Sequence, residues 1–193
     1  MVQNLRIKGG SVIRNIVLLS GEPKVGKTTA FKKIIEMVGK DKCVGFYTEE
    51  ICNEFDRIGF DCVNLDGRRI RIADVSFESD VRIARYGVDI DAFEDFAIQA
   101  INKSIRYHKI IVIDEIGPIQ FISTKFKQEL NNILSAPNCY VIGTIFYKKH
   151  PGIDEIKKIP GIEIYTLTHE NRNSIVENIV QKMFQNNFGG SNS

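Results

Sequence analysis

The stretch that decides the fold is "LLSGEPKVGKTTAFKKI", residues 18–34. It matches the pattern G-x-x-x-x-G-K-[ST] at four fixed positions, Gly21, Gly26, Lys27 and Thr28. An apolar run at 16–19 precedes the pattern, and a run compatible with a helix follows it at 28–38. A strand, a glycine loop and a helix in this order form the context that a P-loop requires. The stretch therefore predicts a loop that holds the phosphates of a nucleotide.

The chemistry of such a loop assigns roles to its residues. Backbone N–H groups of the loop and of the following helix N-terminus face the phosphates. Lys27 can reach the β- and γ-phosphates as a catalytic point charge, and Thr28 can offer its hydroxyl to Mg²⁺. The residues expected to contact the nucleotide are Gly21, Glu22, Pro23, Lys24, Val25, Gly26, Lys27, Thr28 and Thr29.

Length and composition favour one ordinary globular domain. The chain has 193 residues, of which 43% are hydrophobic and 26% are charged. A length of this order suggests a single domain. We expect an N-terminal extension at 1–15, a P-loop NTPase domain at 16–186 and a disordered tail at 187–193.

The net charge and the apolar runs indicate which partners to expect and in which compartment the protein works. The net charge of +2 is too small to argue for nucleic acid. No apolar run reaches the length that spans a membrane, and the N-terminal region does not have the pattern of a signal peptide. We therefore expect a cytoplasmic protein without membrane association. The sequence identifies no protein partner.

Strands and helices alternate along most of the chain. Apolar runs predict strands at 16–19, 43–51, 109–117, 139–145 and 162–167. Helical spacing predicts helices at 28–38, 88–105, 123–134, 153–158 and 170–185. Asp91 is expected to cap the second helix, and Asp66-Gly67 is a hairpin signal within the alternating segment 57–75. The pattern predicts an α/β fold, a single-domain P-loop NTPase with a mostly parallel, doubly wound sheet and an antiparallel hairpin segment.

The second half of the site is predicted at the end of the buried run 109–117. In P-loop proteins an aspartate at the end of such a strand holds Mg²⁺, directly or through water, which predicts that role for Asp114. Glu115 can reach the γ-phosphate side, where it can orient and deprotonate a water molecule. A turn-capping aspartate and a solvated loop glutamate are the alternatives. The residues assigned here to nucleotide binding are Asp114, Glu115, Ile116 and Gly117.

The segment 114–117 also reads as D-x-x-G, the pattern of a GTPase switch. A GTPase usually carries a guanine-reading N-K-x-D after this point. The Asn-Lys pair at 102–103 precedes the segment and is followed by Ser-Ile. The sequence therefore argues against a guanine-specific switch.

Five arginines are weaker candidates. Those on or near the predicted hairpins, one of which could reach a transition-state phosphate, are Arg57, Arg68, Arg69 and Arg71. Arg172 lies at the start of the last predicted helix and could flank the base or the ribose. Because exposed arginines are the norm, solvated charge and local capping are the alternatives. Of the five, Arg172 is assigned to nucleotide binding.

The chain also resembles a known family, the THEP-type nucleoside-triphosphatases, which includes thermophile enzymes and the animal cancer-related nucleoside-triphosphatase. The segments that carry the resemblance, in order, are "GEPKVGKTT", "GFYTEEI", "RIGFDCVNLDG", "ARYGVDIDAFE", "VIDEIG", "HPGIDEI" and "HENRNSI". The resemblance runs from about Ile16 to Met183. It implies a RecA-like P-loop fold and slow, Mg²⁺-dependent hydrolysis of NTPs that tolerates different bases. The chain departs from the family in two places: Lys24 stands where glycine is usual, and 118–120 read Pro-Ile-Gln in place of Lys-Met-Glu.

The leading hypothesis is therefore a Mg²⁺-dependent nucleoside-triphosphatase that uses ATP, GTP or another NTP. In it Lys27 neutralises phosphate charge, Thr28 and Asp114 hold Mg²⁺, and Glu115 activates water. A nucleotide or small-molecule kinase is one alternative, although such kinases often close an arginine-rich lid and no long lid segment occurs late in the chain. A nucleotide-dependent switch or a partner-coupled ATPase is the alternative from a different class.

Overall fold

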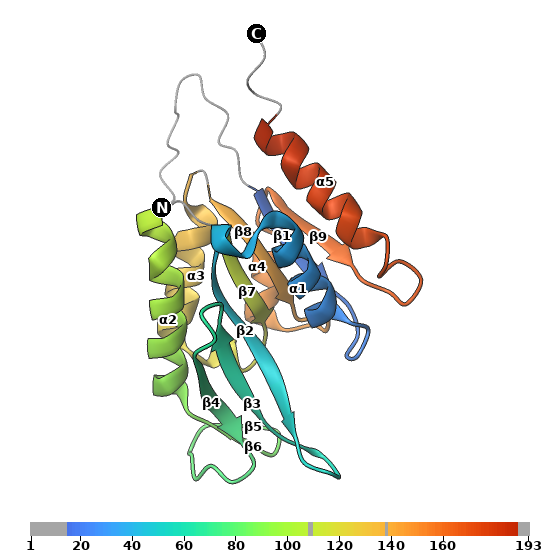
Figure 1. Cartoon of the computed structure of the whole chain (residues 1–193). Coiled ribbons are helices and arrows are strands. Elements are labelled where there is room, and N and C mark those ends of the chain that lie inside the picture. The colour runs from blue at the N-terminus through green and yellow to red at the C-terminus, as the bar shows by residue number, and fades with distance from the viewer. Residues whose placement is uncertain (1–14, 108–109, 138, 189–193) are drawn as a thin grey trace.

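A single sheet of nine strands organises the chain, and helices cover both of its faces (Figure 1). The computed structural model describes residues 15–107, 110–137 and 139–188. The strands are β1 (Asn15–Ser20), β2 (Cys43–Cys52), β3 (Arg57–Asn64), β4 (Arg69–Asp74), β5 (Arg82–Ile83), β6 (Tyr86–Val88), β7 (Ile110–Ile116), β8 (Tyr140–Ile145) and β9 (Ile162–Thr166). The helices are α1 (Lys27–Val38), α2 (Ile90–Tyr107), α3 (Thr124–Ser135), α4 (Pro151–Lys157) and α5 (Ile175–Phe188), with short 3₁₀ turns η1 (Lys40–Lys42) and η2 (Gln120–Ile122).

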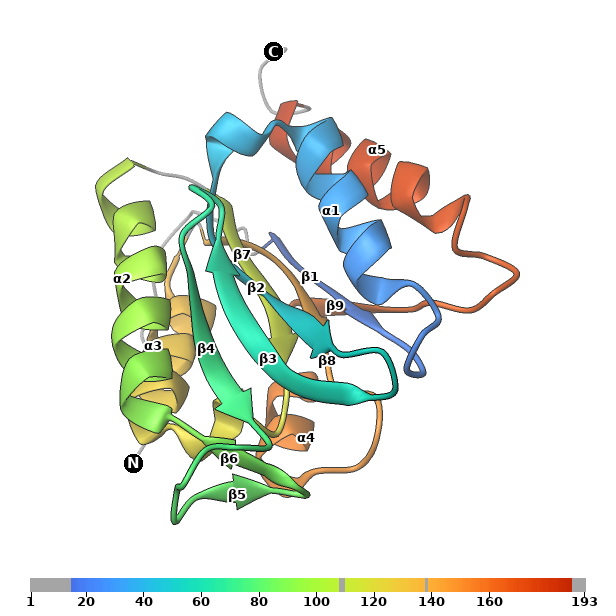
Figure 2. The same ribbon diagram turned by 60° about the horizontal axis from the view of Figure 1, so that its bottom comes forward.

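One part of the sheet is parallel and contains the strands β2-β7-β8-β1-β9 in that order. Successive side chains of a strand point to opposite faces, so a strand covered on both faces needs an unbroken apolar run. In β1, Ile16 and Leu18 pack on one face and Val17 and Leu19 on the other, and all four are buried. Helices α1 and α5 cover one face, and α2, α3 and α4 cover the other (Figure 2). This arrangement confirms the predicted α/β fold.

The other part of the sheet is antiparallel and continues from β2 through β3, β4, β6 and β5. The predicted hairpin joins β3 to β4 at Asp66-Gly67, where the Gly67 N–H donates to the carbonyl of Asn64 at 3.0 Å. Strands β5 and β6 were not predicted, and they lie at the lower end of the sheet in both views (Figures 1 and 2). The predicted hairpin is thus the start of a larger extension.

Helices α2 and α5 begin two and five residues later than predicted. The assignment of Asp91 as the cap of α2 is wrong, because the Ala92 N–H donates to Oδ1 of Asp89 at 2.9 Å and the helix begins at Ile90. Helix α5 begins at Ile175 and not at 170. The side chain of Asn171 accepts from the Thr168 N–H and donates to the Thr166 carbonyl, both at 2.8 Å, which holds the preceding segment as a turn.

The segments predicted to flank the domain are described only in part. Strand β1 begins at Asn15, and α5 continues to Phe188, two residues into the predicted tail. Residues 1–14 and 189–193 lie outside the described residues, as does Lys109, the first residue of one predicted strand. Within the ranges that the structure describes, no helix combines the length and apolar character needed to cross a membrane.

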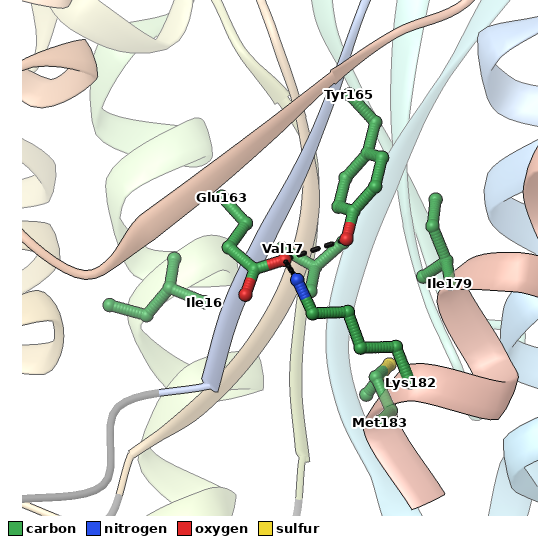
Figure 3. A pocket seen from close by; sticks show the side chains of 7 residues that line it. All are labelled: Ile16, Val17, Glu163, Tyr165, Ile179, Lys182 and Met183. Atoms are coloured by element: carbon green, nitrogen blue, oxygen red, sulfur yellow. Dashed lines mark hydrogen bonds and ion pairs between the residues drawn. The ribbon is translucent and has the colours of Figure 1, made fainter. Parts of the chain in front are cut away.

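A small polar cluster ties α5 to the edge strand β9 (Figure 3). The carboxylate of Glu163 accepts from Nζ of Lys182 at 2.7 Å and from the hydroxyl of Tyr165 at 2.6 Å. The cavity beside them has a volume of about 10 Å³, which is room for about one water molecule. The cluster therefore anchors the last helix, and its cavity is too small for an organic ligand.

Candidate active site

The glycine loop, residues 21–28, connects β1 to α1 as the pattern predicts. Gly26 precedes the helix with φ 102°, a backbone conformation that glycine adopts without steric cost. At Gly21 a Cβ atom would lie 2.6 Å from the carbonyl oxygen of Leu167, so only glycine fits there. The glycines thus allow a tight loop that lies directly against the residues following β9.

The Lys27 ammonium lies over the loop itself. Its Nζ donates to the carbonyls of Gly21 at 3.0 Å and of Glu22 at 3.2 Å. The ammonium is thus held against the backbone of the glycine loop, and a cation beside the N–H groups of such a loop favours an anion there. The geometry agrees with a lysine that moves from loop carbonyls to phosphate oxygens.

Asp114, at the end of β7, joins three elements of the fold. It is 3% exposed, and its Oδ2 accepts from the Thr28 hydroxyl at 2.9 Å. Its Oδ1 accepts from the hydroxyl of Thr144 at the end of β8. Burial raises the pKa of Asp114, and the two hydroxyls and Lys27 oppose that rise. Two of the predicted site residues, Thr28 and Asp114, are therefore in direct contact.

Glu115 is the second acidic residue at this strand end. Burial raises the pKa of its carboxyl to about 7, with Lys27 lowering it and Asp114 raising it. A Cβ atom at Gly117 would lie 3.0 Å from Oε2 of Glu115, so the absence of a side chain there leaves space for the carboxylate. Ile116 is fully buried, and its side chain packs in the apolar core.

Three polar residues that the sequence did not predict lie around Asp114 and its hydrogen-bond partners. They are Thr48 on β2, Gln120 in η2 and Thr144 on β8. Besides Thr144, the Thr48 hydroxyl on β2 donates to the carbonyl of Asp114 at 2.9 Å and accepts from Nε2 of Gln120 at 3.2 Å. Thr144 and Gln120 are 0% and 3% exposed. The signal that could have found Thr48 and Thr144 is a polar residue near the end of an apolar parallel strand, the same signal that identified Asp114.

Comparisons with known proteins agree with this geometry. The sequence model of a family described as "NTPase" matches residues 16–180.

The chain belongs to this NTPase family.

Among curated relatives, the nucleoside-triphosphatase THEP1 of Aquifex aeolicus is 37% identical over 172 residues, which cover 85% of this chain and 96% of that protein. The human cancer-related nucleoside-triphosphatase is 34% identical over 178 residues, which cover 85% of this chain and 94% of that protein. The crystal structure of THEP1 from Aquifex aeolicus superposes with a TM-score of 0.79 at 36% identity and covers 88% of this chain and 98% of that one. The solution structure of a human cancer-related nucleoside triphosphatase superposes with a TM-score of 0.74 at 33% identity and covers 88% of this chain and 97% of that one.

In this member of the NTPase family, the other glycine-loop residues that were predicted to contact the nucleotide differ in solvent exposure. Val25 is buried, whereas the exposed positions are Glu22, Pro23, Lys24 and Thr29. Arg172 is exposed in the turn between β9 and α5, so its predicted place at a helix start is corrected. That turn follows Leu167, whose N–H donates to the Ser20 carbonyl at 2.7 Å. The segment that leads from β9 to the turn of Arg172 therefore borders the glycine loop at Leu167.

The hairpin arginines separate into distinct environments. Arg71 is paired with Asp61 and Asp74, and Arg69 is paired with Glu49 at 3.4 Å. Arg68 is exposed beside the β3–β4 turn. Arg57 lies at the start of β3, where its Nη1 donates to Glu50 at 2.5 Å. Arg71 is thus committed to two acidic partners near the middle of the extension.

Replacing Lys24 by glycine tests the charge in the loop. Lys24 has φ 66°, a value that glycine adopts more easily than lysine, so the loop should keep its shape. We expect the affinity for NTP to fall several-fold at low salt and the difference to shrink as salt rises, because an exposed charge is screened. Nucleotide Kd at two ionic strengths measures this, with Lys33→Ala on α1 as the control. Loss of nearly all turnover would show instead that Lys24 is catalytic.

Proposed function

We propose that the protein hydrolyses nucleoside 5′-triphosphates to diphosphates and phosphate, with Mg²⁺, slowly and with broad base tolerance, in the cytoplasm. The observation that carries this proposal is the contact of Thr28 with Asp114 at 2.9 Å beside the half-buried Glu115, whose carboxyl has a raised pKa. The family match over 16–180 supports an NTPase domain at 16–186, flanked by the segments 1–15 and 187–193.

The oxygen donors at the site fit Mg²⁺. The Thr28 hydroxyl and the Asp114 carboxylate come from different elements and already lie within hydrogen-bond distance. Mg²⁺ takes oxygen ligands and is usually bound by one or two protein groups together with substrate phosphates and water. When bound, the ion supplies charge neutralisation at the β- and γ-phosphate oxygens. Thr144 holds the other Asp114 oxygen, so one carboxylate oxygen keeps its orientation.

The remaining roles belong to the residues of the chain. Lys27 exchanges the carbonyls of Gly21 and Glu22 for phosphate oxygens. Glu115 accepts a proton from the attacking water, and the raised pKa of its half-buried carboxyl makes it a stronger base than an exposed glutamate. Gly117 leaves room for the Glu115 carboxylate, and Arg172 flanks the base or ribose from the turn after β9.

Hydrolysis without an acceptor is the first expected result. We expect steady release of phosphate from Mg²⁺-NTP in the absence of any second substrate, because Glu115 can activate water directly. A phosphate-release assay with and without Mg²⁺ measures this, with EDTA-treated protein as the control. Phosphate transfer that occurs only after an acceptor is added would favour the kinase alternative.

Weak discrimination among bases is the second expected result. The chain has no N-K-x-D after Asp114, so we expect ATP, GTP, CTP and UTP to be hydrolysed with similar kcat/KM. A site built to hydrogen-bond one base can reject others by about 10⁴-fold. A preference of that size, measured in parallel with all four NTPs, would contradict the proposal.

A further inference from the structure

A hollow of about 730 Å³ lies between the glycine loop and the antiparallel extension. Lys24 lines it from the glycine loop, residues 50 and 52–57 line it from the β2–β3 turn, and residues 84–86 line it from the β5–β6 turn. We call it the lateral hollow. It is open to solvent, and its volume falls within the ~300–1,000 Å³ of small-molecule sites.

The lateral hollow lies on the side where a terminal phosphate would point. The segment that leads from β9 to Arg172 borders the glycine loop on one side, since Leu167 contacts Ser20 and Gly21. The acidic pair Asp114 and Glu115 lies on the opposite side, and β2 follows β7 in the strand order. A nucleotide whose base lies towards Arg172 therefore directs its γ-phosphate towards β2, whose far end forms the hollow.

Hydrogen bonds hold the two turns on the far side of the lateral hollow. Oδ1 of Asn53 accepts from the N–H groups of Phe55 at 3.0 Å and of Asp56 at 2.7 Å, which fixes the β2–β3 turn. Arg85 donates to the carboxylate of Asp56 and to the carbonyl of Arg57, both at 2.5 Å, which joins the two turns. The hollow is thus shaped before any ligand binds.

Arg57 is held in the same network. Its Nε donates to the Tyr86 hydroxyl at 3.1 Å, and its Nη1 donates to Glu50 at 2.5 Å. Its guanidinium carbon also lies 4.9 Å from the centre of the Phe60 ring. Such ion pairs at an exposed surface contribute little stability, so the polar groups can exchange partners with a ligand at low cost.

The lining carries no net charge. Its three basic residues are Lys24, Arg57 and Arg85, its three acidic residues are Glu50, Glu54 and Asp56, and 3 − 3 leaves zero. Such a lining offers many hydrogen-bond donors and acceptors but does not select a highly charged molecule. Phe55, at the same hollow, is 92% exposed, and an aromatic ring presented in this way stacks on flat rings.

From these features we propose that the lateral hollow binds a nucleoside, whose flat base stacks on Phe55 and whose hydroxyls contact the surrounding carboxylates and guanidinium groups. The orientation of this site towards a γ-phosphate rests on the proposed function, but the binding itself does not. The ligand binds as a second molecule beside an NTP held by the glycine loop.

The chain contains no tryptophan, so Phe55→Trp places a single reporter in the lateral hollow. Titration with adenosine and with cytidine, at saturating Mg²⁺ and non-hydrolysable NTP, is expected to give a saturable change in tryptophan emission. The control variant Phe184→Trp, on α5, should show none. In equilibrium dialysis, Phe55→Ala should bind nucleoside about tenfold or more weakly than the unmodified protein, and ribose alone should bind similarly weakly.

No saturable change at millimolar nucleoside, or an equal change in Phe184→Trp, would overturn the proposal. Binding of ribose as tight as that of adenosine would overturn the nucleoside assignment. Phosphate release by the unmodified protein is measured separately, so failure of the proposed hydrolysis and absence of nucleoside binding give different results.

Discussion

Replacing Glu115 by glutamine is expected to lower kcat by ~10²–10⁴-fold, the usual contribution of general-base catalysis. The amide keeps the size of the side chain and part of its hydrogen bonding, but it cannot accept the proton of the attacking water. Because Lys27, Thr28 and Asp114 are unchanged, the affinity for Mg²⁺-NTP should stay close to its original value. Single-turnover hydrolysis and nucleotide Kd, measured on the same preparation, test the two halves of this expectation.

Glu94→Gln is a matched control for the Glu115 variant. Glu94 is a carboxylate shielded from solvent, at 6% exposure, but it accepts from the Ser123 hydroxyl and pairs with Lys125 at the start of α3. The control should therefore lower stability without lowering kcat by a comparable factor. Hydrolysis at the original rate in Glu115→Gln would remove Glu115 from the mechanism and favour the nucleotide-dependent switch.

Replacing Asp114 by asparagine is expected to act on binding itself. The amide removes the negative charge that would hold Mg²⁺, and loss of supporting groups around a metal already costs ~10–100-fold in affinity. We therefore expect at least that loss in Mg²⁺-dependent NTP affinity, while binding measured without Mg²⁺ changes much less. Nucleotide Kd titrated against Mg²⁺ concentration measures the effect, with Asp154→Asn on α4 as the surface control.

An unchanged Mg²⁺ dependence in Asp114→Asn would show that the carboxylate serves only as an acceptor for Thr28 and Thr144. The two acidic residues are thus separable by experiment. Glu115 is expected to change the rate at constant affinity, and Asp114 is expected to change the affinity through the metal.

The sequence predicted those parts of the site whose signal comes from residues that are adjacent in the chain. The glycine loop needs a strand, a turn and a helix in succession, and all three lie within 15–38. Asp114 and Glu115 follow a run of apolar residues, which is the local mark of a buried strand. These signals do not depend on which strands are neighbours in the sheet.

The parts that were not predicted depend on sheet register. Thr48 reaches Asp114 because β2 and β7 are neighbours, with Tyr47 opposite Asp114, and no local pattern records that pairing. Strands β5 and β6 span two and three residues, too short for a period of two to be recognised. Helix α5 was placed too early because side-chain bonds of Asn171 compete with helix formation, as asparagine commonly does near helix ends.

The position of the Lys27 amine has a consequence for the thermodynamics of binding. By bridging the carbonyls of Gly21 and Glu22, it closes the loop upon itself. Much of the conformational entropy that an open glycine-rich loop would lose on capturing phosphate is therefore lost earlier, during folding. A nucleotide that binds has to replace only the two carbonyl partners of Lys27 and does not have to order a flexible segment. A site that is pre-organised in this way converts more of its contact energy into affinity.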